Sequence, residues 1–362
     1  MEKKINITFV LPSLIPGGAE RILSFVALHL DRSKFNATLL VVGYEKDTVY
    51  DTKDLHVIYL NKPRVLKSFF SLFHYFRKNK PDIVVSSIVH LNTLIAFMSP
   101  FFRRTKFVSR EANVLSVLAK HNPYTKSIFP KWMVTTGYKL VDKIICQSKD
   151  MQNDMTTNYG VKKEKTTLIN NPITNTFQTK PIARDFTKPI HFITIGRLSK
   201  EKGHDRILEA LSQVDFPFKY TIIGNGIEKE TIFNDIENKG LTSKVNYVPF
   251  TKHVETYLAE SDLFLQGSYV EGFPNVLIES CVVGTPILAF NAPGGLDEII
   301  ENGKNGYIAN TLDAYVEKLN ALNTDFTFTP ETVSNIVKSR FNKSKIITEY
   351  ELLFKSLIHK KP

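Results

Sequence analysis

Residues 190–213 read IHFITIGRLSKEKGHDRILEALSQ, and this stretch predicts the kind of fold that the chain adopts. Ile190–Ile195 has the length and apolar character of a buried strand, and a turn bounded by Gly196 and Gly203 follows at once. Apolar residues then recur at helical spacing over His204–Gln213. A buried strand, a glycine turn and an amphipathic helix begin a β-α-β unit, which predicts a parallel sheet covered by helices.

The same alternation runs through the rest of the chain. In the N-terminal half we expect strands at Ile5–Leu11, Ala37–Val42, His56–Leu60, Ile83–Ser87, Lys106–Ser109 and Lys143–Cys146, and helices at Glu20–Asp31, Leu66–Asn79 and Lys131–Leu140. In the C-terminal half we expect strands at Phe218–Gly224, Val245–Pro249, Leu263–Gln266 and Pro286–Phe290, and helices at Glu228–Lys239, Val254–Glu260 and Asn275–Val283. The pattern predicts an α/β protein.

The alternation is interrupted once. Asn170–Pro172 and the polar stretch Thr174–Pro189 contain prolines and little apolar periodicity, which is typical of a linker. We therefore expect two doubly wound, Rossmann-like domains, residues 1–174 and 175–343. The last segment, Ser344–His359, is amphipathic and is followed by Lys360, Lys361 and Pro362.

Composition excludes several classes of protein. The chain has 362 residues, of which 43% are hydrophobic and 23% charged, so it is not collagen-like, disordered or a disulfide scaffold. Its two cysteines, Cys146 and Cys281, predict no disulfide framework and favour a reducing cytoplasm. No signal peptide is expected at the N-terminus. Ile83–Phe102 is uncharged and as long as a membrane span, but its polar residues favour a strand, a loop and a helix from about Asn92.

Positive charge is concentrated in the first half of the sequence. The net charge is +11, and residues 1–175 hold 26 Lys and Arg against 13 Asp and Glu, whereas the remaining residues hold 21 against 23. Such asymmetry favours a polyanionic partner, either nucleic acid or an anionic membrane surface. No recognised nucleic-acid-binding motif occurs, so we expect no nucleic-acid partner.

Arg197 and Lys202 flank the glycine turn that follows the strand at Ile190–Ile195. Arginine grips two phosphate oxygens at once and lysine supplies a mobile point charge, so this pair suits a diphosphate. A solvated basic loop is the alternative interpretation.

A second motif runs from Glu271 to Glu279. A helix is expected to begin near Pro274 or Asn275, because proline is well tolerated in a first turn. The backbone N–H groups of Asn275–Leu277 would then face a phosphate, while the two carboxylates would accept hydroxyls of a ribose and a sugar. The alternative is a helix with ordinary surface charges.

Two further glycine turns follow expected strands. Gly17 and Gly18 precede a helix expected from Glu20, and Gly224 and Gly226 lie beyond Phe218–Gly224. Glycine lets the backbone approach a ligand closely. Neither turn has the spacing of a dinucleotide fingerprint or a P-loop, and a plain turn remains the alternative for both.

Together, these motifs resemble family 4 of the retaining glycosyltransferases, which have the GT-B fold. The resemblance implies two Rossmann-like domains facing a cleft, an acceptor-binding N-terminal domain and a donor-binding C-terminal one, with the last helix, about residues 344–362, crossing back to the first domain. It implies catalytic roles for Arg197, Lys202 and Glu271, with the two cations on the donor diphosphate and Glu271 facing the donor sugar. It implies donor contacts for Gly18, Gly196, Gly224, Gly226, Gly272, Phe273, Pro274, Asn275, Val276 and Glu279, the last on the ribose.

The chain departs from this family at one place. Many members carry a His or Asp after the strand that we expect to end at Ser109, whereas this chain has Arg110, Glu111 and Asn113. We expect these three residues, with Gly17, on the acceptor side. His90 also follows a strand, as a cleft residue or as a structural histidine.

The resemblance implies that a hexose or N-acetylhexosamine moves with retention from a nucleotide sugar, UDP-linked on family grounds, to a glycan or a polyprenyl-diphosphate-linked acceptor. No Asp-x-Asp motif occurs, so we expect neither metal nor cofactor. A sugar-nucleotide epimerase and a non-catalytic partner subunit are the alternatives. Basic residues around the aromatic run Phe69–Phe76 favour either an ordinary surface helix or a patch on anionic lipid, at the inner face of the cytoplasmic membrane.

Overall fold

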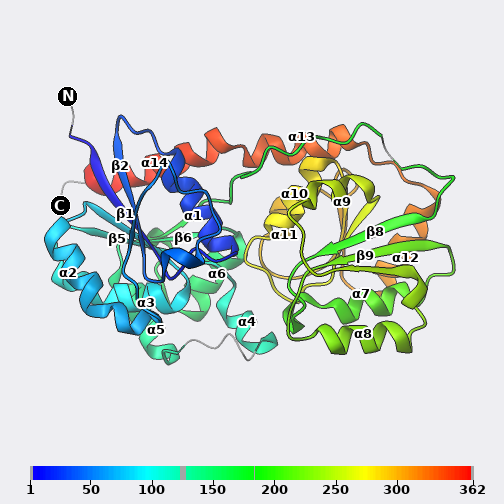
Figure 1. Ribbon diagram of the computed structural model, residues 1–362, viewed down its shortest axis with the longest axis horizontal. Coiled ribbons are helices and arrows are strands. Elements are labelled where there is room, and N and C mark those ends of the chain that lie inside the picture. The colour runs from blue at the N-terminus through cyan, green and yellow to red at the C-terminus, as the bar shows by residue number, and fades with distance from the viewer. Residues whose placement is uncertain (1–2, 123–127, 183, 360–362) are drawn as a thin grey trace. The chain divides into compact units, whose positions relative to one another are not determined.

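The computed structural model describes residues 3–122, 128–182 and 184–359, and these divide into two compact units (Figure 1). Unit 1 holds residues 3–113, 128–174 and 343–359, and unit 2 holds residues 114–122 and the described part of 175–342. Residues 1–2 and 360–362, which the expected N-terminal domain and last helix include, lie outside the described residues.

Unit 1 is built on a seven-stranded sheet with the order β3-β2-β1-β4-β5-β6-β7, and every neighbouring pair is parallel. The strands are β1 (Ile5–Leu11), β2 (Phe35–Val41), β3 (His56–Tyr59), β4 (Ile83–Ser87), β5 (Lys106–Arg110), β6 (Lys143–Cys146) and β7 (Thr166–Leu168). Both faces of a parallel sheet must be covered, which explains why β4 is buried along its whole length.

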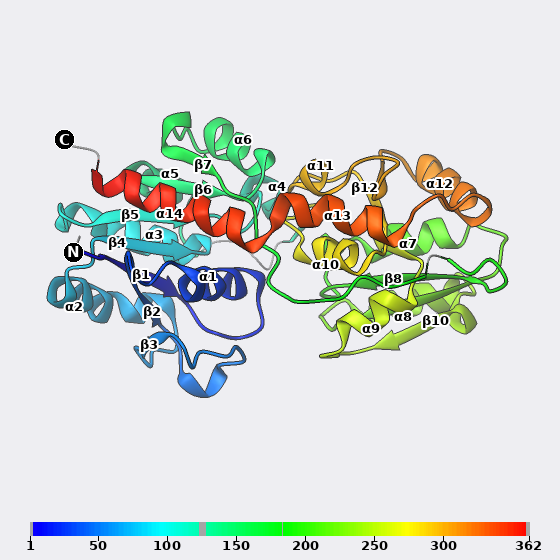
Figure 2. The ribbon, with the colours of Figure 1, turned by 90° about the horizontal axis from the view of Figure 1, so that it is seen from above.

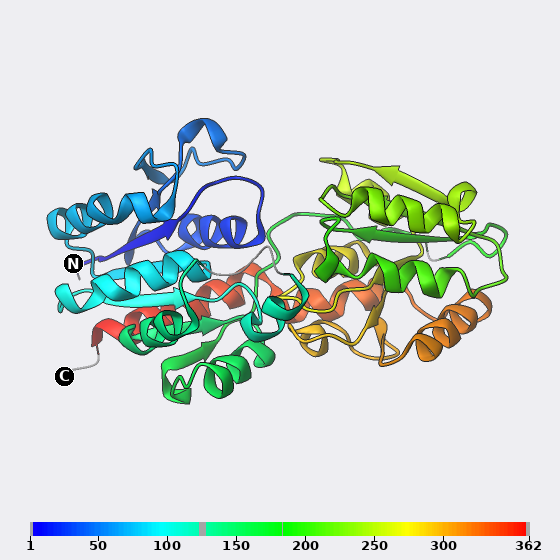
Figure 3. The same cartoon turned by 90° about the horizontal axis from the view of Figure 1, so that it is seen from below.

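Helices cover the two faces of this sheet. They are α1 (Gly18–His29), α2 (Phe69–Asn79), α3 (Val89–Met98), α5 (Lys131–Leu140), α6 (Lys149–Asn158) and α14 (Lys343–His359). In Figure 1, α1 and α14 lie on one side of the strands and α2, α3 and α5 on the other, and Figure 3 views the second group directly.

The last helix, α14, belongs to unit 1 although it comes at the end of the chain. Figure 2 shows it running past α1, with which it packs. Its residues Ile346, Tyr350 and Phe354 recur on one helical stripe and join the buried core around β1. The Phe354 ring meets the edge of Phe9 with centroids 6.1 Å apart. The expected return of the last helix to the first domain is therefore confirmed.

Unit 2 is built on a second parallel sheet, of six strands, with the order β10-β9-β8-β11-β12-β13. The strands are β8 (Ile190–Ile195), β9 (Phe218–Ile223), β10 (Val245–Val248), β11 (Leu263–Gln266), β12 (Ile287–Phe290) and β13 (Gly306–Ala309). The helices are α4 (Leu115–His121), α7 (His204–Leu211), α8 (Lys229–Asn238), α9 (Val254–Glu260), α10 (Asn275–Val283), α11 (Leu296–Ile299), α12 (Leu312–Thr324) and α13 (Pro330–Phe341). Helix α7 packs with α8 and α12, and α10 with α9 and α13.

The segment around β5 and α4 departs from the expected boundaries in two ways. Helix α4 and its flanking residues belong to unit 2, although the sequence places them between strands β5 and β6 of unit 1. Strand β5 also extends one residue further than expected, to Arg110, because Arg110 pairs with Ser87 and Ile145 in the ladder.

The uncharged stretch Ile83–Phe102 forms β4, α3 and a 3-10 turn at Ser99–Phe101, as its polar residues indicated. Within the described residues, no helix combines the length and the hydropathy that a membrane span needs.

One glycine of unit 2 permits a very close backbone contact. Gly203 has φ 58°, and a Cβ atom on it would lie 1.9 Å from the carbonyl oxygen of Gly267, the residue after β11. Gly240 has nearly the same φ, 65°, but a Cβ atom there would meet nothing within 4 Å. Alanine substitutions at Gly203 and at Gly240 therefore separate the free-energy cost of a left-handed backbone from the cost of a steric clash.

We expect Gly203→Ala to lower the free energy of unfolding by at least about 2 kcal/mol more than Gly240→Ala. Both variants carry the strain of positive φ, and only the first also forces two backbones apart. Chemical denaturation of the two variants and the parent protein measures the difference. Equal losses would contradict the close contact.

Candidate active site

The predicted motifs of unit 2 meet at one edge of its sheet. The loops after β8, β9, β11 and β12 leave the carboxyl ends of neighbouring parallel strands, where ligands of such sheets bind. Gly224 and Gly226 let two of these loops pack backbone to backbone: a Cβ atom would lie 1.8 Å from the Gly196 carbonyl oxygen and 2.2 Å from that of Leu198, respectively. These glycines therefore have a packing role, whatever contact they make with a ligand.

Lys202 and Glu271 form the charged centre of this edge. Lys202 Nζ donates to both carboxylate oxygens of Glu271, at 2.7 Å and 2.9 Å. Gln266 Nε2 and Ser268 Oγ also donate to Glu271 Oε1, at 2.7 Å and 2.6 Å. Because Glu271 is only 6% exposed, these donors replace the water that its carboxylate has lost.

The loop that carries Glu271 is fixed from both sides. The Glu271 N–H donates to the carbonyl oxygen of Pro293 at 2.9 Å. Arg206 of α7 donates through Nε to the carbonyl oxygen of Gly267 at 2.9 Å, and its guanidinium stacks over the Tyr269 ring, 4.1 Å from the centroid. Both ends of residues 267–271 are thus held, so the Glu271 carboxylate has a defined position.

The side chain of Arg197, unlike that of Lys202, is mostly exposed, with 71% of its surface open to solvent. Its Nη2 lies 3.6 Å from Glu201 Oε1 in a loose ion pair, and the rest of the guanidinium faces solvent. The sequence predicts the same role for Arg197 and Lys202, but their settings differ. Arg197 is an exposed, flexible cation, whereas Lys202 is held by Glu271.

Helix α10 begins at Asn275 with Pro274 as its N-cap, as expected. The N–H of Leu277 already donates to the Pro274 carbonyl oxygen at 3.0 Å, so the expectation that it faces a phosphate is wrong. The side chain of Phe273 is buried against Phe341 of α13, with centroids 5.5 Å apart, and anchors the loop. Gly272 is buried in the same loop, and Val276 lies in the first turn of the helix.

Glu279 lies on α10, just over one turn from the helix start, and its side chain is half-buried. The expected ribose role of Glu279 stays a prediction. Among the described residues, no group of three or more His, Cys, Asp or Glu side chains is arranged to hold a metal ion.

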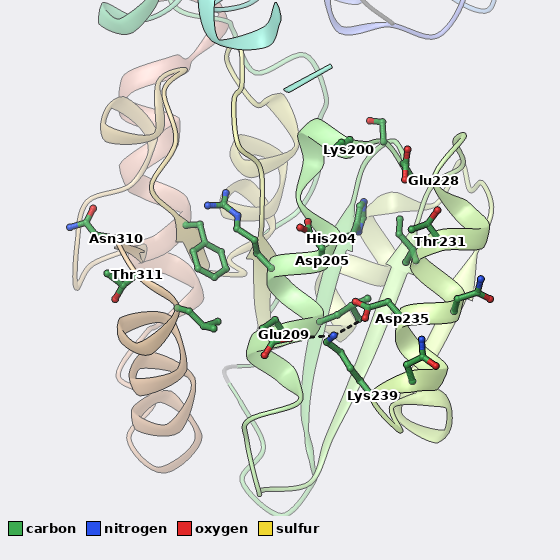
Figure 4. Close-up of a pocket in the computed structure, with 18 residues that line it drawn as sticks. Lys200, His204, Asp205, Glu209, Glu228, Thr231, Asp235, Lys239, Asn310 and Thr311 are labelled. Carbon is green, nitrogen blue, oxygen red and sulfur yellow. Dashed lines mark hydrogen bonds and ion pairs between the residues drawn. The ribbon is translucent and has the colours of Figure 1, made fainter. Parts of the chain in front are cut away.

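A hollow of about 920 Å³ opens elsewhere on unit 2, over α7, α8 and the start of α12 (Figure 4). It includes His204, Lys200 and Glu228, and Lys239 forms ion pairs with Glu209 and Asp235 on its floor. None of the described residues predicted for the site lines it. The hollow therefore does not mark the predicted donor site.

His204 connects α7 to the donor loop, a role that the sequence did not indicate. Its Nε2 lies 3.2 Å from the carbonyl oxygen of Arg197, which only accepts, so Nε2 carries the proton. Burial lowers the pKa of His204 to about 4, so the ring is neutral at pH 7.

The glycine loop of unit 1 is held by a tyrosine. Tyr50 Oη accepts from the Gly17 N–H and donates to the Gly17 carbonyl oxygen, both at 2.8 Å. Helix α1 begins at Gly18, two residues before the expected start at Glu20. Gly17 is the N-cap of α1, and a Cβ atom on it would meet Glu20 Oε2 at 2.1 Å.

Arg110 and Glu111 are more deeply buried than an acceptor contact needs, with 1% and 0% of their surfaces exposed. Arg110 Nη2 donates to Asn171 Oδ1 at 2.6 Å. Glu111 Oε1 accepts from Asn92 Nδ2 at 2.8 Å and from the Tyr138 hydroxyl. In the described conformation neither side chain reaches solvent, so direct contact with an acceptor requires their surroundings to move.

Two other residues were expected near the acceptor. Asn113 is half-buried in the loop before α4. His90 lies in the first turn of α3, and burial lowers the pKa of its ring. The helix is preceded by Ile88 with φ 76°, a strained conformation for a β-branched residue, which no sequence pattern predicted.

Comparison with known proteins gives the class to which this geometry belongs. Residues 16–176 match the family described as Glycosyltransferase Family 4, and residues 176–335 match the family described as Glycosyl transferases group 1. The structure of Anabaena Alr3699/HepE in complex with UDP-glucose is similar to this one, with a TM-score of 0.81, 20% identity and coverage of 97% of this chain and 100% of the other. The chain is thus a glycosyltransferase with the GT-B fold.

Curated relatives narrow the family. An N-acetylgalactosamine-N,N'-diacetylbacillosaminyl-diphospho-undecaprenol 4-alpha-N-acetylgalactosaminyltransferase of Campylobacter jejuni is 26% identical over 306 residues, which cover 82% of this chain and 83% of the relative. The O-antigen biosynthesis glycosyltransferase WclY of Escherichia coli is 22% identical over 362 residues, with coverage of 98% and 99%. The first half of the chain thus matches glycosyltransferase family 4, and the chain is a glycosyltransferase of the family 4 type.

The buried Glu111 predicts a pH dependence of stability. Burial raises the pKa of its carboxyl from 4.5 to about 7, so the folded protein binds this proton more tightly than the unfolded chain does. The free energy of unfolding therefore falls as pH rises from about 4.5 to about 7, because the buried carboxyl must then ionise.

Glu111→Gln keeps an acceptor for Tyr138 and removes this ionisation. The parent should lose about 3 kcal/mol of unfolding free energy between pH 5 and pH 8 that the variant keeps. The unfolding free energy of the variant minus that of the parent should therefore be larger at pH 8 than at pH 5 by this amount. Urea denaturation at both pH values measures it, and Glu45→Gln, at an exposed site, is the matched control. The same difference at both pH values would contradict the assignment.

Proposed function

We propose that this glycosyltransferase moves a hexose or N-acetylhexosamine from a UDP-sugar to a growing bacterial surface glycan, with retention at the anomeric carbon and without a metal ion. The observation that carries the proposal is the Lys202–Glu271 pair, held by buried donors at the carboxyl edge of the sheet beside the start of α10. This is where the family places its donor sugar and diphosphate.

The chemistry requires charge stabilisation on the leaving diphosphate. Lys202 has three N–H donors and uses two on Glu271, so the third is available to a phosphate oxygen. The exposed fork of Arg197 supplies further donors, and the first turn of α10 adds its positive end. Donors placed around the leaving group in this way would stabilise the developing negative charge without a metal.

Glu271 is an acceptor in this proposal. Its Oε1 is occupied by three donors and its Oε2 by Lys202 alone, so Oε2 retains capacity for a sugar hydroxyl. The attacking acceptor hydroxyl gives its proton to the departing phosphate. No carboxylate is assigned as a covalent nucleophile.

The identity of donor and acceptor rests on the similar proteins. Anabaena Alr3699/HepE is described in complexes with UDP and with UDP-glucose, and the Campylobacter jejuni relative is named for a diphospho-undecaprenol acceptor. WclY is named for O-antigen biosynthesis. We infer a UDP-sugar and a polyprenyl-diphosphate-linked glycan for this chain, which would place it at the cytoplasmic face of a membrane.

We expect Lys202→Ala to lower kcat for sugar transfer by about 100-fold to 1,000-fold, because it removes a fixed donor from the leaving diphosphate. Lys200→Ala, which removes an exposed lysine from the same turn, is the matched control and should retain activity. Release of UDP and transfer of labelled sugar, both with a chelator present, are the measurements.

Calorimetric titration of the parent protein with UDP, GDP and ADP decides the nucleotide. Micromolar binding of UDP in the presence of a chelator supports the proposal. Binding of GDP or ADP instead would mean that the donor sugar carries that nucleotide. Activity that needs a divalent ion would contradict metal independence, and an epimerised UDP-sugar without transfer would favour the epimerase alternative.

A surface of unit 1 supports contact with a membrane. Phe70 and Phe101 are 83% and 70% exposed, and successive ring contacts through Phe69 and Phe73 link them into one apolar patch. Leu66, which is 51% exposed, lies just before this run in the sequence. Exposed basic residues flank this patch in the sequence: Arg64, Lys67, Arg103 and Arg104. Apolar side chains bordered by positive charge suit an interface with anionic lipid.

We expect Phe70→Ser combined with Phe101→Ser to weaken binding to anionic vesicles more than tenfold, because burying each ring contributes about 1.5–3 kcal/mol. Flotation with phosphatidylglycerol-containing and with neutral vesicles measures binding. Phe250→Ser, at a phenylalanine that is also 70% exposed but lies in unit 2, is the control. Equal binding to both kinds of vesicle would contradict the role of charge.

A further inference from the structure

Helix α4 makes an unexpected contact within unit 2. It packs on the 3-10 turn Lys200–Lys202, which belongs to the donor loop after β8. Asn122, which follows the helix, donates through Nδ2 to Glu201 Oε2 at 2.7 Å. The ring of His121 stacks on Tyr269, with centroids 4.9 Å apart and planes 5° from parallel. Residues from the N-terminal half of the sequence therefore contact both loops that carry the charged centre.

Glu201 is the residue that receives this contact. Its surface is only 3% exposed, and its backbone carbonyl accepts the N–H of Tyr269 at 2.9 Å. Within the described residues Oε1 accepts no hydrogen bond, and the Arg197 guanidinium 3.6 Å away faces it. A buried carboxylate with one unsatisfied oxygen strongly attracts a nearby cation, because the surroundings screen its charge weakly.

Arg197 needs such an anchor if it is to bind a ligand well. With 71% of its side chain exposed, it loses conformational freedom whenever it is held in one geometry. An attraction toward Glu201 restricts that freedom before a ligand arrives and leaves the other N–H groups of the guanidinium for phosphate oxygens.

We propose that Glu201 is a positioning residue that holds Arg197 ready for the donor diphosphate, and that Asn122 fixes Glu201 for this task. The inference rests on the proposed function, since it assumes that Arg197 binds the diphosphate. The proposal makes α4 and Asn122 part of the donor site, although the family resemblance implies no donor contact for them.

The test compares two ligands. We expect Glu201→Gln and Asn122→Ala each to weaken binding of UDP by about tenfold, the size of a lost hydrogen bond to a charged group. Neither should change binding of uridine, which lacks phosphates. Calorimetry measures UDP, and a ligand-detected NMR titration measures uridine. Ala119→Ser, at an exposed position of α4, is the matched control.

A double-mutant cycle shows whether the two residues act through Arg197. In an Arg197→Ala background, Glu201→Gln and Asn122→Ala should have no further effect on UDP binding. Thermal unfolding of each variant verifies that it is folded. Should Glu201→Gln fail to fold, Asn122→Ala carries the test, because it removes only the side chain that holds Oε2.

Three results would overturn the inference: UDP binding equal to the parent's, an equal loss for uridine and UDP, or a loss that persists without Arg197. If the parent protein binds no nucleotide, the proposed function fails, and the inference fails with it. If the parent binds UDP and the variants match it, only the inference fails.

Discussion

The charged centre of unit 2 depends on close backbone contacts that only glycine permits. Gly224 packs on Gly196, Gly203 on Gly267 and Gly294 on Glu271, each at a distance that leaves no room for a Cβ atom. These contacts join the loops after β8, β9, β11 and β12 into one layer at the edge of the sheet. Lys202 and Glu271 come from two of those loops, 69 residues apart, and their geometry therefore follows from the backbone beneath them.

The buried carboxylates of the two units differ in the hydrogen-bond donors that they receive. Glu271 receives donors on both oxygens, one of them a lysine, whereas Glu111 has one oxygen that accepts no hydrogen bond among the described residues. Burial accordingly raises the pKa of Glu111 to about 7. The lysine and the two neutral donors on Glu271 replace the water that its buried carboxylate has lost. Glu111 accepts from two neutral donors, Asn92 and Tyr138, on one oxygen, and its burial contributes a pH-dependent cost.

Periodicity predicted most of the long elements, because strands buried on both faces and amphipathic helices leave clear patterns. Ile5–Leu11, Ile190–Ile195 and Asn275–Val283 match the structure residue for residue. The short strands β7 and β13 were missed, since three or four residues carry too little pattern. The sequence placed Arg197 and Lys202 on one loop but gave no sign that Lys202 pairs with Glu271 or that Arg110 is buried. Such contacts depend on tertiary packing, which local patterns do not contain.

The placement of α4 has a consequence for protein engineering. A fragment cut at the linker, residues 175–342, would contain the donor loops of the six-stranded sheet but would lack Asn122 and His121. A chimera that joins this half to the N-terminal half of another family member would face the same problem, because the incoming segment before its α5 equivalent must present a donor to Glu201. Exchange of halves between relatives is therefore expected to succeed only when residues 114–122 travel with the C-terminal half.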